Sequence, residues 1–543
     1  MLAAFDIGAD SNLGDGSIND HETESSLTGA SSNVELVIEK FETGQISVYG
    51  KPVIYMPPQD KTKKKSKPSS FEFQYFHCPV ILSYISNFFK WQYMEYNLYI
   101  YRESFLTDFF RDKGDLKESL PYCNEELIFA ICACGSAIDL GDNVFMYKGV
   151  LYDSSDKFYN RSRYLLFQKL NSDDCNSITA VQTFLCLAFY DLGRGRTLSA
   201  WILSGIAFRI GLHMGFELNL QPSHEPQSSK SNLTDYDLNV RSRIYWGCRV
   251  ADYFISFVLG RSPTLEYLNA TIPKSENLPT LPGIEFFLYY DPIEKDSKIS
   301  NISHPLEQIY RLYRLAHKCN EKIHYESSTA GRFHFQTLHH LHNFNLEVQE
   351  WRNNLIDQLY WTKAELKTAG FNPNPMSFRY QYYTILLSIN RDFIDSKHSD
   401  DTADVVTPRR ICLSAIEDVY YSIMSFKTYH SLRYASLNMV YLCILSITIL
   451  EKLPDAINMP LQRTSMIEFF GRVLKECSAS WGLARSAYES FSSLFKGGNA
   501  LGHHMPGSGR INASDTPISG TKPVHDRDMQ DLDESLIPSL NYS

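Results

Sequence analysis

The stretch that decides the fold contains three long apolar segments: SITAVQTFLCLAFYDLG (177–193), TLSAWILSGIAFRIGLHMG (197–215) and DLNVRSRIYWGCRVADYFISFVLGRSPTL (237–265). Apolar residues fall on nearly every face of these segments if they are helical. Such helices must be buried among other helices rather than lie on a surface. Glycines and a basic turn separate the first two segments, and a Ser-rich loop precedes the third. The stretch therefore predicts three packed helices at the centre of an all-α protein.

The second segment carries small residues at helical spacing: Ala200, Ser204, Ala207 and Gly211. This spacing predicts a narrow face that lets a neighbouring helix approach closely. Arg209 is the only fixed charge in an otherwise largely apolar segment, and a buried charge needs a partner.

Two interpretations of the charged residues remain open. In the first, Arg209 or Arg249 pairs with Asp252 as a purely structural contact. In the second, polar and aromatic side chains of the two helices line an effector pocket. The residues of that candidate pocket are Trp201, Arg209, Arg243, Trp246 and Asp252.

The order of residues in these helices resembles the regulatory domain of fungal zinc binuclear-cluster transcription factors, also called the fungal-specific or xylanolytic-activator regulatory domain. The matching residues are Ala200, Trp201, Ala207, Arg209, Gly211, Gly215, Asp237, Arg241, Arg243, Trp246, Asp252, Gly260, Arg261 and Pro263. The departures from the family pattern are Phe216, Glu217, Ser242, Tyr245 and Ser262. Weaker similarity extends over roughly residues 40 to 500. The resemblance implies a large multi-helical regulatory domain in a nuclear regulator of transcription.

The cysteines do not form the zinc cluster that heads such regulators. None of the eleven cysteines belongs to a Cys-x-x-Cys pair, and most lie in apolar runs, which indicates small buried hydrophobic residues. We therefore expect no cofactor in this chain, and zinc only in relatives that carry the cluster. The chain is expected to begin after the position of such a head. By resemblance, full-length relatives bind DNA through that head, often as dimers.

Composition agrees with a helical body flanked by flexible ends. Of 543 residues, 43% are hydrophobic and 13% aromatic, which suffices for a large core. Residues 1–70 read as a disordered head and linker, 71–300 as the regulatory core, 301–500 as its helical continuation, and 501–543 as a disordered acidic tail. The head ends in a basic run that is a candidate nuclear-import signal, consisting of Lys61, Lys63, Lys64, Lys65 and Lys67. The tail interleaves acidic and apolar residues, which is typical of activation segments that bind co-regulators or the transcription machinery.

Several classes of function are disfavoured. A net charge of −10 gives the chain no overall electrostatic attraction to DNA. The most apolar segment, 435–450, is too short and too polar for a membrane span, so we expect a buried helix and no membrane partner. His339, His340 and His342 lack ligand-spaced partners, and no catalytic motif occurs, so we expect no enzyme. We expect a transcription regulator that can form a homodimer. The alternative is a stand-alone helical ligand-binding or scaffolding protein.

Overall fold

The computed structural model describes residues 75–494, except 97, 112–121, 140–144, 148–149, 173, 219–233, 266–269, 273–277, 279–280, 328–332, 395–406, 454–459 and 493. Helices make up most of the described chain, and two short hairpins are its only sheets. The predicted all-α class is therefore confirmed, with the hairpins as an addition that the sequence patterns did not reveal. The expectations for residues 1–70 and 501–543, with their lysine run and acidic tail, lie outside the described residues.

The first half of the body surrounds two helices that the sequence predicts well, α7 (Ile178–Gly193) and α8 (Thr197–His213). The Ser177 hydroxyl accepts a hydrogen bond from the Ala180 N–H and so starts α7, whose residues are all buried. The elements that precede them are η1 (Tyr75–His77), α2 (Pro79–Trp91), α3 (Tyr93–Tyr96), α4 (Arg102–Phe109), α5 (Glu125–Ala137), β1 (Phe145–Tyr147), β2 (Val150–Tyr152) and α6 (Ser155–Asn171).

A buried carboxylate holds the turn between α7 and α8. Asp191 is fully buried, and it accepts hydrogen bonds from Arg196 at 2.7 Å and from the Tyr159 hydroxyl at 2.9 Å. Gly195 in this turn has a φ of 79°, in the left-handed region that favours glycine. The basic turn of the sequence is thus the point where α7 reverses into α8.

The small residues of α8 form the predicted buried face. Ala200, Ser204 and Ala207 have no exposed surface, and Gly211 is also buried. This face lies in the core, so the sequence prediction is confirmed. Arg209 lies on the opposite side and is exposed, because a helix with a narrow small-residue face still leaves one side to solvent.

The third predicted helix, α9 (Asp235–Leu259), begins in a capping box formed by Thr234 and Asp237, and ends at Gly260 with a φ of 62°. Its middle comes very close to the chain that follows α3. A Cβ atom added at Gly247 would lie 1.7 Å from the Leu98 carbonyl oxygen. Only glycine permits this contact without a shift of the backbone.

The second half consists of helices that pack mainly around α13 and α15. Its elements are α10 (Pro305–Ser327), α11 (Phe333–Asn353), α12 (Lys363–Thr368), η4 (Ala369–Phe371), α13 (Pro373–Asn390), η5 (Arg391–Phe393), α14 (Pro408–Tyr429), η6 (Leu432–Tyr434), α15 (Leu437–Lys452), α16 (Pro460–Cys477) and α17 (Gly482–Ser490). Helix α15 is the apolar segment of the sequence, and it is buried along almost its whole length. Within the described residues, no helix is both long enough and apolar enough to cross a membrane.

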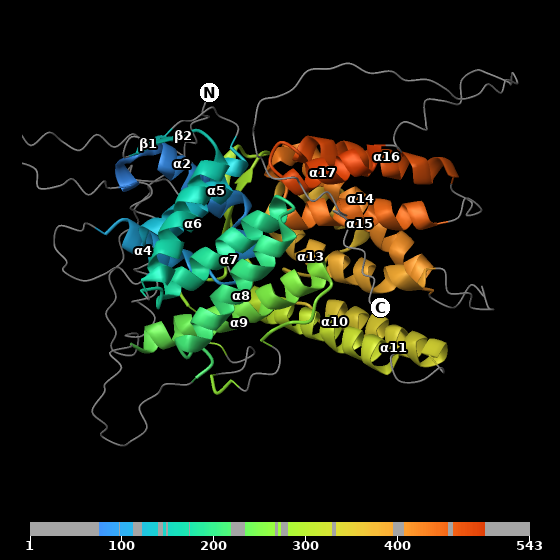
Figure 1. The fold of residues 1–543 in the computed structure, drawn as a ribbon. Helices are drawn as coiled ribbons and strands as arrows, with labels where there is room; N and C mark the ends of the chain where they lie inside the picture. The colour runs from blue at the N-terminus through green and yellow to red at the C-terminus, as the bar shows by residue number, and fades with distance from the viewer. Residues whose placement is uncertain are drawn as a thin grey trace, which may run out of the picture.

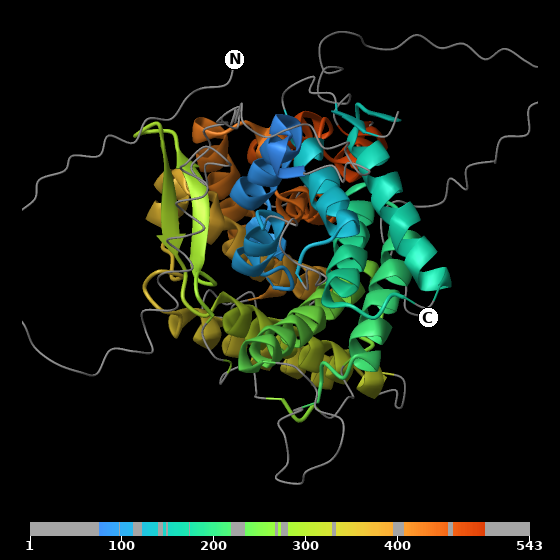
Figure 2. The same ribbon diagram turned by 90° about the vertical axis from the view of Figure 1, so that its left-hand side faces the viewer.

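The larger hairpin joins the two halves in sequence. Strands β3 (Phe286–Asp291) and β4 (Asp296–Asn301) pair antiparallel, with Leu288 opposite Ile299. Before β3, residues 282–285 form a turn that contains Pro282 and Gly283, two residues that disfavour a helix. Figure 2 shows this hairpin along one edge of the helical body.

The two halves share one core. Figure 1 places α2 to α8 on one side and α13 to α17 on the other, with α9, α10 and α11 along the bottom. Buried apolar residues form a continuous cluster from Tyr75 to Phe491. Helix α10 packs against both α9 and α13, and α17 packs against both α7 and α15. All eleven cysteines are free thiols, and all but half-buried Cys78 are buried in this core. We call the boundary between the two sets of helices the seam.

Candidate functional site

The five residues of the candidate effector pocket make different contacts in the structure. Trp201 is half-buried, and the Arg261 guanidinium lies over its ring at 5.2 Å. Arg209 is exposed and donates to the Gly205 carbonyl of its own helix at 3.3 Å. The expectation of a buried charge at Arg209 is therefore wrong, because its position on α8 turns it away from the core.

Arg243 and Trp246 face different elements although they are three residues apart on α9. Burial lowers the pKa of Arg243, and the charged and phenolic groups that act on it are Tyr101, Glu285 and Tyr93. Trp246 instead packs edge-to-face on Tyr310 of α10, with ring centroids 4.8 Å apart. The two side chains thus belong to separate contacts.

Asp252 anchors the loop that follows α9. Its carboxylate accepts hydrogen bonds from the backbone N–H groups of Thr264 at 2.6 Å and Leu265 at 2.7 Å. Burial raises the pKa of Asp252 to about 6, against the lowering effect of these hydrogen bonds. Arg249 lies instead over the rings of Trp246 and Tyr310, at 5.5 and 5.7 Å. The Arg249 charge also acts on Asp252 and lowers its pKa, so backbone hydrogen bonds and cation–π contacts add to the expected electrostatic interaction of the two residues.

The histidines of α11 form local contacts. The His339 ring nitrogen lies 3.1 Å from the Asn343 amide, one turn along the helix. In the described part of the chain, no group of three or more His, Cys, Asp or Glu residues is arranged to hold a metal ion.

Cavities between the described residues lie along the seam. Three of them contain residues of both halves, and we name them the Arg194 pocket, the Glu95 cavity and the apolar cleft. Their walls come from α3, α5, α7, α8 and α9 of the first half and from α13, α15, α17 and their flanks in the second. The seam is therefore the candidate functional site.

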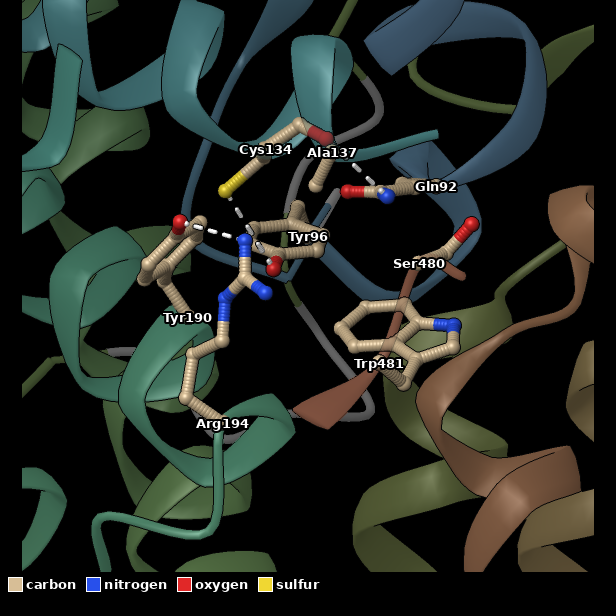
Figure 3. Close-up of a pocket in the computed structure, with 8 residues that line it drawn as sticks. All are labelled: Gln92, Tyr96, Cys134, Ala137, Tyr190, Arg194, Ser480 and Trp481. Carbon is tan, nitrogen blue, oxygen red and sulfur yellow. Dashed lines mark hydrogen bonds between the residues drawn. The ribbon is translucent and has the colours of Figure 1, made fainter. Parts of the chain in front are cut away.

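The Arg194 pocket, shown in Figure 3, lies where the turn after α7 meets the start of α17. Its lining residues are Gln92, Tyr96, Cys134, Ala137, Tyr190, Arg194, Ser480 and Trp481. Arg194 donates to the Tyr190 hydroxyl at 2.8 Å, and the Trp481 indole N–H donates to the Ala435 carbonyl at 2.8 Å. Gln92 donates to the Cys134 carbonyl at 3.3 Å. These bonds occupy most donors of the pocket and hold its walls together.

The Glu95 cavity is a buried polar site of the seam. Glu95 of α3, Gln381 of α13 and Asn438 of α15 are 6%, 4% and 3% exposed. The Glu95 carboxylate accepts a hydrogen bond from the Asn438 N–H at 3.3 Å, in the first turn of α15. Burial raises the pKa of Glu95 to about 7, although hydrogen bonds from Asn438, Ser436 and Leu437 lower it. The remaining wall is apolar.

The apolar cleft lies next to this cavity, and Phe254 of α9 lines both. Its other lining residues are Leu192, Thr197, Val258, Leu259, Leu437, Tyr441, Ile444 and Leu483. Thr197 is exposed, and Leu259 and Leu483 are half-buried, so the cleft opens to solvent at these residues. It encloses about 530 Å³ of space between atoms, part of which is open to solvent. The ring of Phe254 stacks on that of Phe189, with centroids 5.5 Å apart.

Sequence reasoning did not find the seam. Glu95 and Asn438 are 343 residues apart, and neither belongs to a motif. One signal was present: Glu95 is an isolated carboxylate in the aromatic run FFKWQYMEYNLYIY, where burial is expected. Nothing in the sequence indicates its partner.

The chain is similar to known fungal regulators of transcription. The model of the fungal specific transcription factor domain matches residues 85–354. The chain is 34% identical over 381 residues to the TY1 enhancer activator of Saccharomyces cerevisiae, covering 69% of this chain and 47% of that relative. It is 35% identical over 381 residues to the activatory protein CHA4 of the same yeast, covering 68% of this chain and 55% of the relative.

A third relative matches over a longer stretch. The uncharacterized transcriptional regulatory protein C757.04 of Schizosaccharomyces pombe is 31% identical over 457 residues, which cover 83% of this chain and 68% of the relative. The chain spans about half the length of the two budding-yeast relatives. No solved structure matches the chain. On the strength of these matches, the chain belongs to the family of proteins with a fungal specific transcription factor domain.

Proposed function

We propose that this chain is the regulatory body of a transcription regulator. The observation that carries the proposal is its similarity to two yeast proteins whose names describe activators. The matched residues of the domain include α7, α8 and α9, and the second half packs on them in one core. The whole helical body, rather than the matched domain alone, is therefore the unit that we expect to regulate.

We assign direct contact with DNA to full-length relatives in the family. We do not assign it to the described residues of this chain. Sequence-specific DNA binding needs basic side chains that neutralise phosphates and read base edges, and the chain has a net charge of −10. We propose that zinc and direct DNA reading belong to a cysteine-rich head in relatives that carry one. The partners of this chain are then co-regulators or the transcription machinery, and a second copy of the chain.

The cellular site and the absence of catalysis are parts of the same proposal. We place the protein in the nucleus, with the run at Lys61, Lys63, Lys64, Lys65 and Lys67 as the import signal. A regulator needs no catalytic residues, and the seam contains buried carboxyl and amide groups without an activated nucleophile beside them. We therefore propose a binding and regulatory role rather than an enzymatic one.

A reporter assay tests the proposal. The whole chain is fused to an unrelated DNA-binding domain, and output is measured from a promoter that carries the matching sites. We expect output to change relative to the DNA-binding domain alone, and to fall when residues 520–543 are deleted. Deletion of residues 1–24, a segment of equal length, is the matched control. A fusion that is nuclear and abundant but silent would contradict the proposal and favour a stand-alone ligand-binding or scaffolding protein.

A further inference from the structure

Among the described residues, the Glu95 cavity contains one buried acceptor that lacks a donor. The Asn438 side-chain oxygen is buried and has no hydrogen-bond partner within the described residues. Glu95 itself accepts hydrogen bonds from Asn438, Ser436 and Leu437, and the bond from the Asn438 N–H, at 3.3 Å, is long for a charge-assisted bond. None of the residues that line this cavity is basic. A guest that satisfies the cavity must therefore donate hydrogen bonds.

The surroundings favour a positive charge on that guest. A buried carboxylate is costly unless it is paired, and pairing by an ion inside the protein is strong because the local dielectric is low. The Glu95 charge acts on the buried hydroxyls of Tyr99 and Tyr313, which also lack hydrogen-bond partners among the described residues. A primary ammonium has three donors, which match the acceptors here better than the single donor of an alcohol.

The apolar cleft provides both a route and a place for an apolar chain. It runs from the exposed Thr197 to Phe254, and Phe254 is the one residue that it shares with the Glu95 cavity. A rotation of this ring away from Phe189 would join the two spaces. The joined space is polar and acidic at its inner end and apolar toward solvent.

We propose that the seam binds a small organic ammonium, with its charged head at Glu95 and Asn438 and its hydrocarbon chain in the apolar cleft. The head contacts α3 and α15, and the chain contacts α7, α9 and α15. A ligand held by helices of both halves stabilises one arrangement of the halves over others. This inference deepens the proposed regulatory function, but it is tested by binding alone, so its failure leaves the reporter assay unaffected.

The test measures binding of three six-carbon probes to the full 543-residue chain by isothermal titration calorimetry. The probes are hexylamine, hexanol and hexanoate at pH 7.5. We expect hexylamine to bind saturably and about tenfold more tightly than hexanol, because the ammonium pairs with Glu95. Hexanoate should not bind, because its carboxylate would face that of Glu95.

Three variants assign the site. Glu95→Gln keeps the shape of the cavity and should weaken hexylamine binding about tenfold while leaving hexanol binding unchanged. Leu483→Trp fills the half-buried mouth of the cleft and should abolish binding of both. Met424→Trp, at an exposed position of α14, adds the same side chain outside the seam and should change neither. Circular dichroism checks that each variant is folded, and Glu95→Gln carries the test if Leu483→Trp is not. Absence of hexylamine binding, equal affinity for the three probes, or hexylamine affinity unchanged by Glu95→Gln would overturn the proposal.

Discussion

Helix α9 passes through two regions that are packed in opposite ways. At Gly247, it lies so close to the Leu98 carbonyl that no side chain fits between them. One to three turns later, Val250, Ala251, Phe254 and Val258 line cavities of the seam instead. The first contact joins elements of one half and leaves no space for rearrangement. The second joins the two halves and contains polar groups with unmet hydrogen bonds. Close packing inside a half and unfilled space between halves thus occur along a single helix.

The largest expected effect comes from adding one methyl group at the tight contact. Gly247→Ala should lower the free energy of unfolding by more than about 4 kcal/mol, or prevent folding, because the new Cβ would overlap a backbone carbonyl that cannot move alone. Gly205→Ala is the matched control on α8, where the Cβ would meet only the mobile end of the Arg209 side chain, at 3.2 Å.

The control variant should be neutral or gain up to about 1 kcal/mol from the higher helix propensity of alanine. Urea denaturation followed by circular dichroism measures both variants. Equal stability of Gly247→Ala and Gly205→Ala would show that the contact at Gly247 relaxes easily. The contrast between this contact and the part of α9 that lines cavities would then be lost.

The second prediction concerns the seam, where the buried Glu95 carboxyl should make the free energy of unfolding depend on pH. The pKa of Glu95 is about 7 in the folded protein and about 4.3 in an unfolded chain. The folded state therefore binds this proton more tightly, so the free energy of unfolding falls as pH rises from about 4 to about 7. Linkage sets an upper limit of about 4 kcal/mol on this loss.

Glu95→Gln should remove this component of the pH dependence and make the protein more stable than the wild type at pH 8. Thermal or urea unfolding at pH 5, 6, 7 and 8 provides the measurement. Glu489→Gln, at an exposed position of α17, is the control and should follow the wild-type curve. A Glu95→Gln variant whose stability runs parallel to that of the wild type at every pH would contradict the burial of an ionisable carboxyl at the seam.

The smallest expected effect separates two arginines that look alike in sequence. Arg249 is 8% exposed and lies over the rings of Trp246, Tyr253 and Tyr310, whereas Arg209 is exposed. Arg249→Gln should cost about 1–3 kcal/mol through lost cation–π contacts and packing. Arg209→Gln should stay within about 0.5 kcal/mol of the wild type. The denaturant midpoints of the two variants measure this difference in stability. A larger loss for Arg209→Gln than for Arg249→Gln would support the sequence-based expectation that Arg209 is buried.

Much of the architecture was predictable because helices are encoded locally. The Ser177 cap, the capping box at Thr234 and Asp237, and the small-residue face of α8 each depend on residues three or four positions apart. The resemblance to the family also depends on the spacing of residues within single helices. The side of α8 on which Arg209 lies was not predictable, because apolar residues occur on nearly every face of that segment. Strands β3 and β4 were missed because a hairpin of polar and aromatic residues has little period-two contrast.

The sequence by itself determined that this protein is a buried helical body of the fungal regulatory type, since helical periodicity and capping are properties of neighbouring residues. Only the tertiary structure decided where the halves meet and which polar groups that meeting buries. Glu95 and Asn438 are 343 residues apart, and their contact depends on the combined packing of α3, α9, α13 and α15. The energy of a buried carboxylate depends on what surrounds it, and no local pattern of residues records those surroundings.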